Sequence, residues 1–347
     1  MESIKEIRTH IDSVQQTLKI TNAMYLISSS KLRKARQQLT NIQPYFTKTQ
    51  QTISDILHRT QDVEHVYFDR RPGKPHKAGY IVITGDKGLA GAYNHNILKL
   101  AEQKMESHPN ASLFVVGQVG RSYFQEHGIP IDVEFLYTAQ DPNAYRAREI
   151  ADTFVEHFRK GRLDEVYIVY TEMVTPMTLE PKIIKLLPLD RDAFPWKPRP
   201  RADGGMRREV TYMPSPAQVL NHIVPGYLKG LLLGTLVESF CSEQNARMMA
   251  MDTATDNARE LLKTLELEYN RARQTAITQE ITEIVAGAQG GGDGPVQQLG
   301  AAHARVKHDA DDGALLHRPD LVFQPGQIGI LRIVGFQVLN RLDAFLD

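Results

Sequence analysis

The sequence predicts an α/β fold, with a long antiparallel coiled coil of N- and C-terminal helices joined to a central α/β domain that has a mostly parallel sheet. Heptad patterns fill both ends of the 347-residue chain. Two such helices can pair antiparallel only if the chain between them folds as a compact module and returns to its starting point. In that middle part, short β-branched runs alternate with helical segments, which is typical of α/β layers.

The first heptad pattern begins at Ile4 and ends at Ile56. A helix of about 55 residues would be roughly 80 Å long, several times the mean globular helix, which indicates a coiled coil. Pro44 falls at an outward position, where a proline would kink the helix or end its first segment, and we expect a bend there. The predicted seam consists of Ile4, Ile7, Ile11, Val14, Leu18, Thr21, Tyr25, Ser28, Leu32, Ala35, Leu39, Ile42, Phe46, Thr49, Ile53 and Ile56.

The pattern of residues in the central part of the chain predicts a Rossmann-like domain. Strands alternating with helices favour a mostly parallel sheet, because parallel strands need crossover connections. A stretch rich in proline and glycine, residues 190–208, predicts an exposed loop before the second long helix. The expected strands are 80–84, 113–116, 133–136, 166–171 and 183–187, and the expected helices lie near 93–107, 119–127 and 143–160.

The second heptad pattern could form a helix on the order of 100 Å long. The middle of its seam is small or polar, where the first helix also weakens at Thr21 and Ser28. Either the two backbones approach closely there, or the seam is simply imperfect, as coiled-coil seams often are. This seam consists of Leu220, Ile223, Tyr227, Gly230, Gly234, Val237, Cys241, Gln244, Met248, Met251, Thr255, Ala258, Leu262, Leu265, Tyr269, Ala272 and Ala276.

These patterns divide the chain into five expected parts. The tail starts with GGGDGP after Gln289, which is typical of a flexible linker, and we assign the tail no role. The parts are an N-terminal coiled-coil helix (1–60), a central α/β domain (75–190), a Pro/Arg-rich loop (191–213), a C-terminal coiled-coil helix (214–288) and a C-terminal extension (289–347).

The composition limits the possible partners and cofactors. Lys+Arg and Asp+Glu both number 41, so the net charge of zero gives no global electrostatic reason to expect nucleic acid. The single cysteine, Cys241, excludes an internal disulfide and a thiolate metal cluster, and it fits a reducing compartment. No leader peptide is apparent, and no stretch reaches the roughly 18 apolar residues of a membrane span. We predict no metal site and no cofactor.

The glycine-rich loop GDKGLAG, residues 85–91, follows the first expected strand. A Walker-type loop needs Gly-Lys-Ser/Thr, but Lys87 precedes Gly88 and no hydroxyl follows. The dinucleotide fingerprint also fails, because the spacing is G-x-x-G-x-x-G. A tight turn that lets the next helix pack on the sheet is the favoured interpretation.

Two other functions stay open at this point. A nucleotide-binding α/β enzyme would use Gly85–Gly91 and carry the long helices as a coiled-coil dimerisation stalk. A structural coiled-coil adaptor would share the long helices, and no enzyme activity would depend on it. No catalytic motif such as H-E-x-x-H or a nucleophile elbow is present in the sequence.

Several collinear motifs resemble the gamma subunit of the F-type ATP synthase. They are ITNAMYLISSSKLRKA (20–35), GDKGLAGAYN (85–94), SEQNARMMAMDTATDNARELL (242–262) and ARQTAITQEITEIVAGA (272–288). The resemblance covers about residues 1–289 and implies a central-stalk rotor subunit that transmits torque between a membrane ring and a catalytic hexamer. Catalysis would then belong to another subunit, and the chain would not be an enzyme on its own.

The resemblance also implies the partners and the location. The partners would be the alpha and beta subunits in a 3:3:1 assembly with this chain, the epsilon subunit and the membrane c-ring. The chain would lie at the cytoplasmic face of a bacterial plasma membrane and associate with the membrane only through the complex. The coupling ion, H⁺ or Na⁺, stays open.

Matching the motifs residue by residue gives the expected contacts. Tyr212 would contact the ring, although Met213 stands where the family often has a glutamate. An apolar helix tip, formed by Ile277, Ile281, Ile284 and Val285, would sit in an apolar bearing. The expected contacts with the hexamer are Met24, Lys31, Arg33, Lys34, Arg247, Arg273, Gln274, Thr278 and Glu280.

Overall fold

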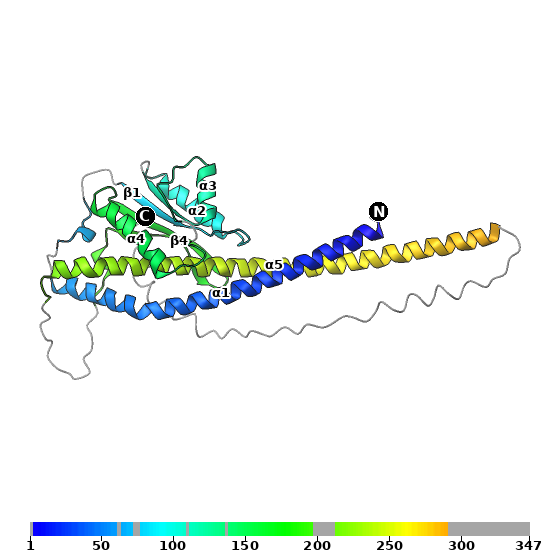
Figure 1. The fold of residues 1–347 in the computed structure, drawn as a ribbon, viewed down its shortest axis with the longest axis horizontal. Helices are drawn as coiled ribbons and strands as arrows, with labels where there is room; N and C mark the ends of the chain where they lie inside the picture. Colours follow the sequence, from blue (N-terminus) through cyan, green and yellow to red (C-terminus); the bar gives the residue numbers. More distant parts are fainter. Residues whose placement is uncertain are drawn as a thin grey trace, which may run out of the picture. The chain divides into compact units, whose positions relative to one another are not determined.

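The computed structural model describes residues 3–60, 64–71, 77–108, 111–135, 138–196 and 212–290. Two long helices, α1 (Ile4–Arg59) and α5 (Pro216–Gly290), dominate it (Figure 1). The described residues form two compact units: residues 20–255 make one, and residues 3–19 with 256–290 make the other. Both long helices contribute to both units.

Within residues 20–255 the two helices pair antiparallel, as predicted. Thr21 near the start of this part of α1 meets Thr255 of α5, whereas Phe46 farther along α1 stacks on Tyr227, with ring centroids 5.0 Å apart. Every predicted seam position of α1 is buried or half-buried. The helix continues through Pro44 for 56 residues, so the proline does not end it, and Figure 1 shows α1 changing direction in its second half.

The central domain contains one five-stranded sheet in the order β3-β2-β1-β4-β5. The strands are β1 (Ala78–Ile83), β2 (Ser112–Val116), β3 (Val133–Phe135), β4 (Glu165–Thr175) and β5 (Thr178–Leu187). The first four are parallel and β5 is antiparallel to β4, which confirms the mostly parallel sheet. The last two strands are longer than predicted, because they join directly in a hairpin.

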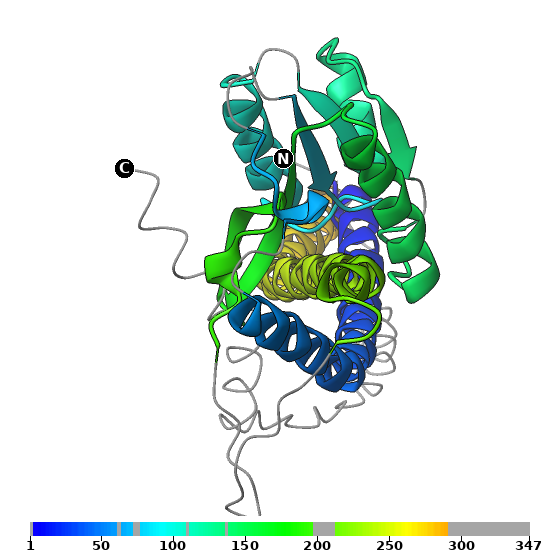
Figure 2. The same cartoon turned by 90° about the vertical axis from the view of Figure 1, so that its left-hand side faces the viewer.

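Helices cover both faces of this sheet (Figure 2). On β1, Tyr80 and Val82 pack with α2 (Tyr93–Met105) and α3 (Gln118–Glu126), whereas Ile81 and Ile83 pack with α4 (Ala144–Arg159) and α5. This alternation follows from the two-residue period of a strand. Two short 3₁₀ helices, η1 (Val66–Phe68) and η2 (Arg191–Ala193), lie in the connections to the long helices.

The unit made of residues 3–19 and 256–290 has a small core. It is formed at predicted seam positions by Ile7, Val14, Ala258 and Leu265. The expected apolar tip is exposed, with Ile284 at 71%. The C-terminal extension was predicted to begin at residue 289, but α5 continues to Gly290. The rest of that extension, residues 291–347, and most of the predicted Pro/Arg-rich loop lie outside the described residues.

One stretch of α5 is more apolar than the sequence reasoning allowed for. An 18-residue window of this helix reaches a mean hydropathy of 1.2, enough by length and composition to cross a membrane, and 56% of that window is buried inside the protein. This stretch of α5 is apolar because the sheet and α1 surround it, as happens for core helices of globular domains.

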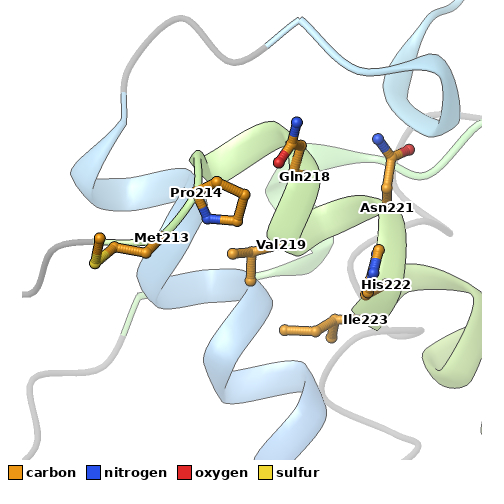
Figure 3. A pocket seen from close by; sticks show the side chains of 7 residues that line it. All are labelled: Met213, Pro214, Gln218, Val219, Asn221, His222 and Ile223. Atoms are coloured by element: carbon orange, nitrogen blue, oxygen red, sulfur yellow. The ribbon is translucent and has the colours of Figure 1, made fainter.

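The first turns of α5 border an open hollow of about 360 Å³ (Figure 3). Met213, which precedes the helix, is 82% exposed. A hydrogen bond of 3.0 Å between His65 Nε2 and Asn221 Oδ1 joins this part of α5 to the segment before η1. The hollow is lined by Met213, Pro214, Gln218, Val219, Asn221, His222 and Ile223.

Candidate functional site

The best-defined polar site is the junction between α5 and the central domain. Polar side chains on about three turns of α5 bond to the domain, mostly to its backbone, although this helix is buried on nearly all sides. A buried polar group needs such a partner, because its desolvation otherwise costs free energy. We call these residues the polar strip: Glu238, Ser239, Ser242, Glu243, Asn245 and Arg247.

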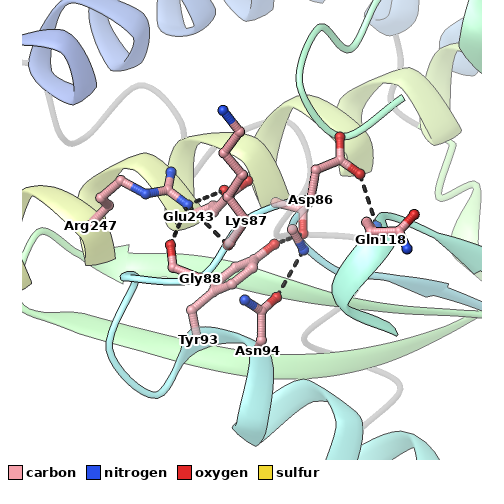
Figure 4. A network of polar contacts seen from close by, with 10 residues as sticks. Asp86, Lys87, Gly88, Tyr93, Asn94, Gln118, Glu243 and Arg247 are labelled. Carbon is pink, nitrogen blue, oxygen red and sulfur yellow. Dashed lines mark hydrogen bonds and ion pairs between the residues drawn. The ribbon is translucent and has the colours of Figure 1, made fainter. Parts of the chain in front are cut away.

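One half of the junction holds the glycine-rich loop (Figure 4). Arg247 Nη2 donates to the carbonyl oxygens of Lys87 at 3.2 Å and Gly88 at 3.1 Å, and it lies 2.6 Å from Glu243 Oε1. Both charged side chains are buried, with Arg247 8% and Glu243 5% exposed. Burial raises the pKa of Glu243, and the Arg247 guanidinium opposes that rise.

The loop itself is fixed by α2 and α3. Gly85 N–H donates to Asn94 Oδ1 at 2.9 Å, and Asp86 Oδ1 accepts from the Gln118 N–H at 2.9 Å. Gly91, with φ of +55°, supplies a left-handed conformation that favours glycine. The predicted tight turn before α2 is therefore confirmed, and its outer side rests on α5.

The other half of the junction holds the β4–β5 hairpin. Ser242 Oγ donates to the Thr171 carbonyl at 2.9 Å, and Asn245 Nδ2 donates to the Pro176 carbonyl at 2.7 Å. Glu238 Oε1 accepts from the Met173 N–H at 3.1 Å. The polar strip of α5 thus forms hydrogen bonds with two segments of the domain that are far apart in sequence, the glycine-rich loop and the β4–β5 hairpin.

Charged groups from four elements surround Met173. Burial, chiefly, raises the pKa of Glu238 to about 7, and the nearby Glu172 raises it further while Arg36 of α1 lowers it. Glu172 is itself buried and lies 2.5 Å from Lys182 Nζ of β5. Arg36 Nη2 donates to Met173 Sδ at 3.6 Å. This half of the junction therefore contains a carboxyl group that changes charge near neutral pH.

The loop geometry does not suit a phosphate. The Gly85 amide already donates to Asn94, and the carboxyl carbon of the buried Glu243 lies only 3.0 Å from the position that a Cβ on Gly85 would take. A phosphate at this position would meet negative charge from Glu243 and Asp86. In the part of the chain that the structure describes, no group of three or more His, Cys, Asp or Glu side chains could hold a metal ion.

The expected hexamer contacts on α1 are mostly at the surface. Lys31, Arg33 and Lys34 are exposed, and Met24 is half-buried. Next to them lie three exposed apolar side chains, Ile20, Leu26 and Ile27.

The expected contacts on the last part of α5 are also exposed. These are Arg273, Gln274, Thr278 and Glu280. Thr278 Oγ1 donates to the Gln274 carbonyl one turn earlier, at 2.8 Å. Tyr212, the expected ring contact, is half-buried beside the start of α5.

The chain matches one family of known proteins over most of its length. The sequence profile described as ATP synthase matches residues 3–290. The ATP synthase gamma chain of Ruminiclostridium cellulolyticum is 49% identical over 289 residues, which cover 82% of this chain and 98% of that protein. This chain belongs to the ATP synthase gamma-chain family. The sodium-ion-specific ATP synthase gamma chain of Acetobacterium woodii is 39% identical, over 83% of this chain and 98% of that one.

Solved structures agree with the fold of this gamma-chain family member. A chain from the Euglena gracilis mitochondrial ATP synthase, solved as an OSCP/F1/c-ring assembly, superposes with a TM-score of 0.57 at 17% identity, covering 85% of this chain and 97% of that one. A chain of the central stalk and c-ring of the Tetrahymena thermophila mitochondrial ATP synthase gives a TM-score of 0.52 at 21% identity, covering 68% and 99%. At such identities the likeness supports the fold alone.

Most of the polar strip was not predicted from the sequence. The sequence motifs selected Arg247 but not Glu238, Glu243 or Asn245, because charged and amide residues on a long helix usually face solvent. One signal was available: the seam weakens to small and polar residues at the same place. Small and polar residues there are consistent with a helix that packs against more than one neighbour.

Proposed function

We propose that this chain is the central-stalk rotor subunit of an ATP synthase, which transmits torque between a membrane ring and the catalytic hexamer of alpha and beta subunits. The observation that carries the proposal is the match to gamma chains over residues 3–290. Catalysis is assigned to the beta subunit, and this chain supplies mechanical coupling of ion flow to ATP synthesis.

The pairing of α1 and α5 supports a mechanical role. Two helices that wrap around each other resist bending and twisting better than one helix does. Within residues 20–255 the pairing is reinforced by the sheet and α4, which pack on α5. The part of the chain that would carry load is thus built from continuous helices.

The exposed face of α1 fits a partner with acidic and apolar groups. Lys31, Arg33 and Lys34 provide positive charge, and Ile20 and Ile27 provide apolar surface one to three turns earlier. We propose that this face, with Met24, contacts the beta subunits, whose acidic segments would be attracted at short range. Near the C-terminal end of α5, Arg273, Gln274, Thr278 and Glu280 would contact the upper part of the hexamer.

Arg247 differs from these residues, because its burial leaves little of the side chain for a partner. At the start of α5, Tyr212 and the neighbouring hollow would face the ring. The assembly would be 3:3:1 for alpha, beta and this chain, with epsilon and the c-ring as further partners, at the cytoplasmic face of the plasma membrane. The five-part division given above stays a proposal, with 289–347 as an extension of unassigned role.

The proposal is tested by co-expressing the full chain with the alpha and beta subunits of its source organism. We expect the three to co-purify and ATP hydrolysis to depend on this chain. Arg273→Ala and Lys34→Ala should lower the hydrolysis rate, whereas the exposed Arg271→Ala and Lys48→Ala serve as matched controls and should not. An ATPase that is indifferent to this chain would refute the rotor role and favour an adaptor.

The nucleotide-binding alternative is tested separately. Labelled ATP and NAD are titrated against the isolated full-length chain. We expect no saturable binding, because the loop's outer side is filled by Glu243 and Arg247. Tight binding that is lost on substitution within residues 85–91 would favour the enzyme alternative.

A further inference from the structure

Arg247 and Glu243 occupy successive turns of α5 and act together on one loop. The same guanidinium nitrogen, Nη2, reaches the Glu243 carboxylate and the carbonyls of Lys87 and Gly88. Figure 4 shows the three acceptors converging on this one group from α5 and from the loop. The glutamate neutralises the buried guanidinium, and the guanidinium holds the loop.

The loop is attached to the rest of the domain on its other sides. Asn94 of α2 accepts from the Gly85 amide, and the Gly85 carbonyl accepts from the Val119 amide of α3 at 3.1 Å. A force on α5 that reaches Arg247 is therefore passed to α2 and α3 through the loop. Tyr93 OH, 2.8 Å from Ser239 Oγ, makes a direct polar contact between α5 and α2.

A buried ion pair is a poor way to gain stability, because the desolvation of two charges offsets their attraction. Apolar side chains of similar size would hold the two elements together equally well but would not fix their relative position. Hydrogen bonds to two carbonyls do fix it, because their strength falls steeply with angle and distance. The contact is thus suited to resisting sliding between α5 and the domain.

We propose that Glu243 and Arg247 form a latch that fixes the loop of residues 85–88 on α5, so that torque passes between the long helices and the central domain without slip. Arg247 is then a positioning residue that acts inside the chain. This inference rests on the proposed rotor function. The latch would be the place where torque passes between α5 and the central domain.

The latch is tested in the complete ATP synthase, reconstituted in liposomes with Arg247→Gln, Arg247→Lys or Glu243→Gln. The exposed ion pair of Arg259 and Asp256 on the same helix, 2.9 Å apart, provides a matched control in Arg259→Gln. Amide exchange of residues 86–89, ATP hydrolysis without an ion gradient, and ion transport per ATP are measured. We expect exchange to rise about tenfold in Arg247→Gln, the effect of losing a hydrogen bond to a charged group.

Ion transport per ATP should fall several-fold in Arg247→Gln while hydrolysis without a gradient changes little. Arg247→Lys should lie between, since an ammonium keeps the charge but not the planar fork. Glu243→Gln and Arg247→Gln should be non-additive in the double variant. If Arg247→Gln fails to assemble, the lysine variant and Glu243→Gln carry the same test.

Three results would overturn the latch. Loop exchange could stay as in the unsubstituted chain, or hydrolysis and transport could fall in equal proportion, as a merely structural defect predicts. Alternatively, the two substitutions could be additive, with Glu243→Gln silent, which a direct contact of Arg247 with a partner predicts. If the unsubstituted chain itself supports no coupled hydrolysis, the rotor function fails, and the two failures are thereby distinguished.

Discussion

Residues 224–247 and residues 256–290 belong to one continuous helix, α5, but their surroundings differ sharply. In the first stretch side chains are buried on nearly every side, by α1 and by the central domain. In the second stretch, as far as residue 287, only seam positions such as Ala258 and Leu265 are buried, and residues 277–287 are all exposed. The first stretch is a core helix, and the second is one of the two helices of a narrow coiled coil.

The difference explains two features of the sequence. The second stretch keeps a regular heptad pattern, because a single partner helix selects residues only along one stripe. The first stretch loses that regularity and acquires the polar strip, because its other faces meet the loop and the hairpin of the domain. A weak heptad seam here marks extra packing partners.

The largest expected effect is the loss of stability when a buried leucine is truncated in each of the two stretches. Leu232→Ala removes a fully buried side chain from the multi-sided core, and Leu265→Ala makes the same chemical change in the two-helix unit. We expect the first to cost near the upper end, and the second near the lower end, of the roughly 2–5 kcal/mol range for such changes, since a narrow seam can collapse around the cavity.

Urea unfolding of the full-length variants, with amide exchange to locate the opening, measures both costs. Leu265→Ala should increase exchange in residues 3–19 and 256–276 and leave the sheet protected. Equal costs, or sheet opening in both variants, would contradict the distinction between the stretches.

The next largest effect concerns the closeness of the loop to α5. A Cβ on Gly85 would lie 3.0 Å from Glu243 Cδ, whereas a Cβ on Gly88 would meet nothing within 4 Å. Gly85→Ala should destabilise the chain by about 1–3 kcal/mol, the range for overpacking, and Gly88→Ala should be neutral or slightly stabilising. Thermal unfolding of both variants compares them, and a neutral Gly85→Ala would show that α5 yields at this point.

A pH effect should appear at the hairpin half of the junction. The pKa of Glu238 is raised from 4.5 to about 7 in the folded chain, so ionisation is less favourable there than in the unfolded chain. The stabilising contribution is therefore complete below pH 4.5 and is lost as the pH rises through about 7. The hairpin should loosen on the alkaline side.

Glu238→Gln should remove this pH dependence while keeping the acceptor for the Met173 amide. Amide exchange of residues 171–176, corrected for intrinsic rates, is measured between about pH 5 and 8, the range in which Glu238 should lose its proton. Amide exchange of β2, residues 112–116, serves as the internal control. An unchanged pH profile in Glu238→Gln would assign the effect to another group.

The smallest effect concerns the buried pair at the end of the 20–255 unit. Thr21 Oγ1 and Thr255 Oγ1 lie 2.8 Å apart, and both residues are buried. Either Thr→Val change alone should cost about 1 kcal/mol, and the double change should cost less than the sum, because it removes both polar groups together. A double-mutant cycle in urea provides the coupling free energy, and strict additivity would show that the hydroxyls do not interact.

Much of the fold could be predicted because its signals are local. The α1 seam, the order of strands and helices, and the turn at residues 85–91 all follow from periodicity and glycine placement. The β4–β5 hairpin was predicted only as two shorter strands, because Met173, Pro176 and Met177 do not form a recognisable turn pattern. The bend expected at Pro44 could be predicted because an isolated proline disrupts one turn of a helix, and the uninterrupted heptad pattern indicated that the helix continues beyond it.

The sequence by itself determined that two long helices pair antiparallel around an α/β insertion, and its motifs placed the chain in the gamma-chain family. Only the tertiary structure decided that Arg247 faces inward, onto the carbonyls of Lys87 and Gly88, which are 160 and 159 residues away. Periodicity reports which face of a helix is apolar. It does not report which backbone, folded from a distant segment, will meet a polar side chain, and that meeting sets the burial, the pKa of Glu238 and the proposed latch.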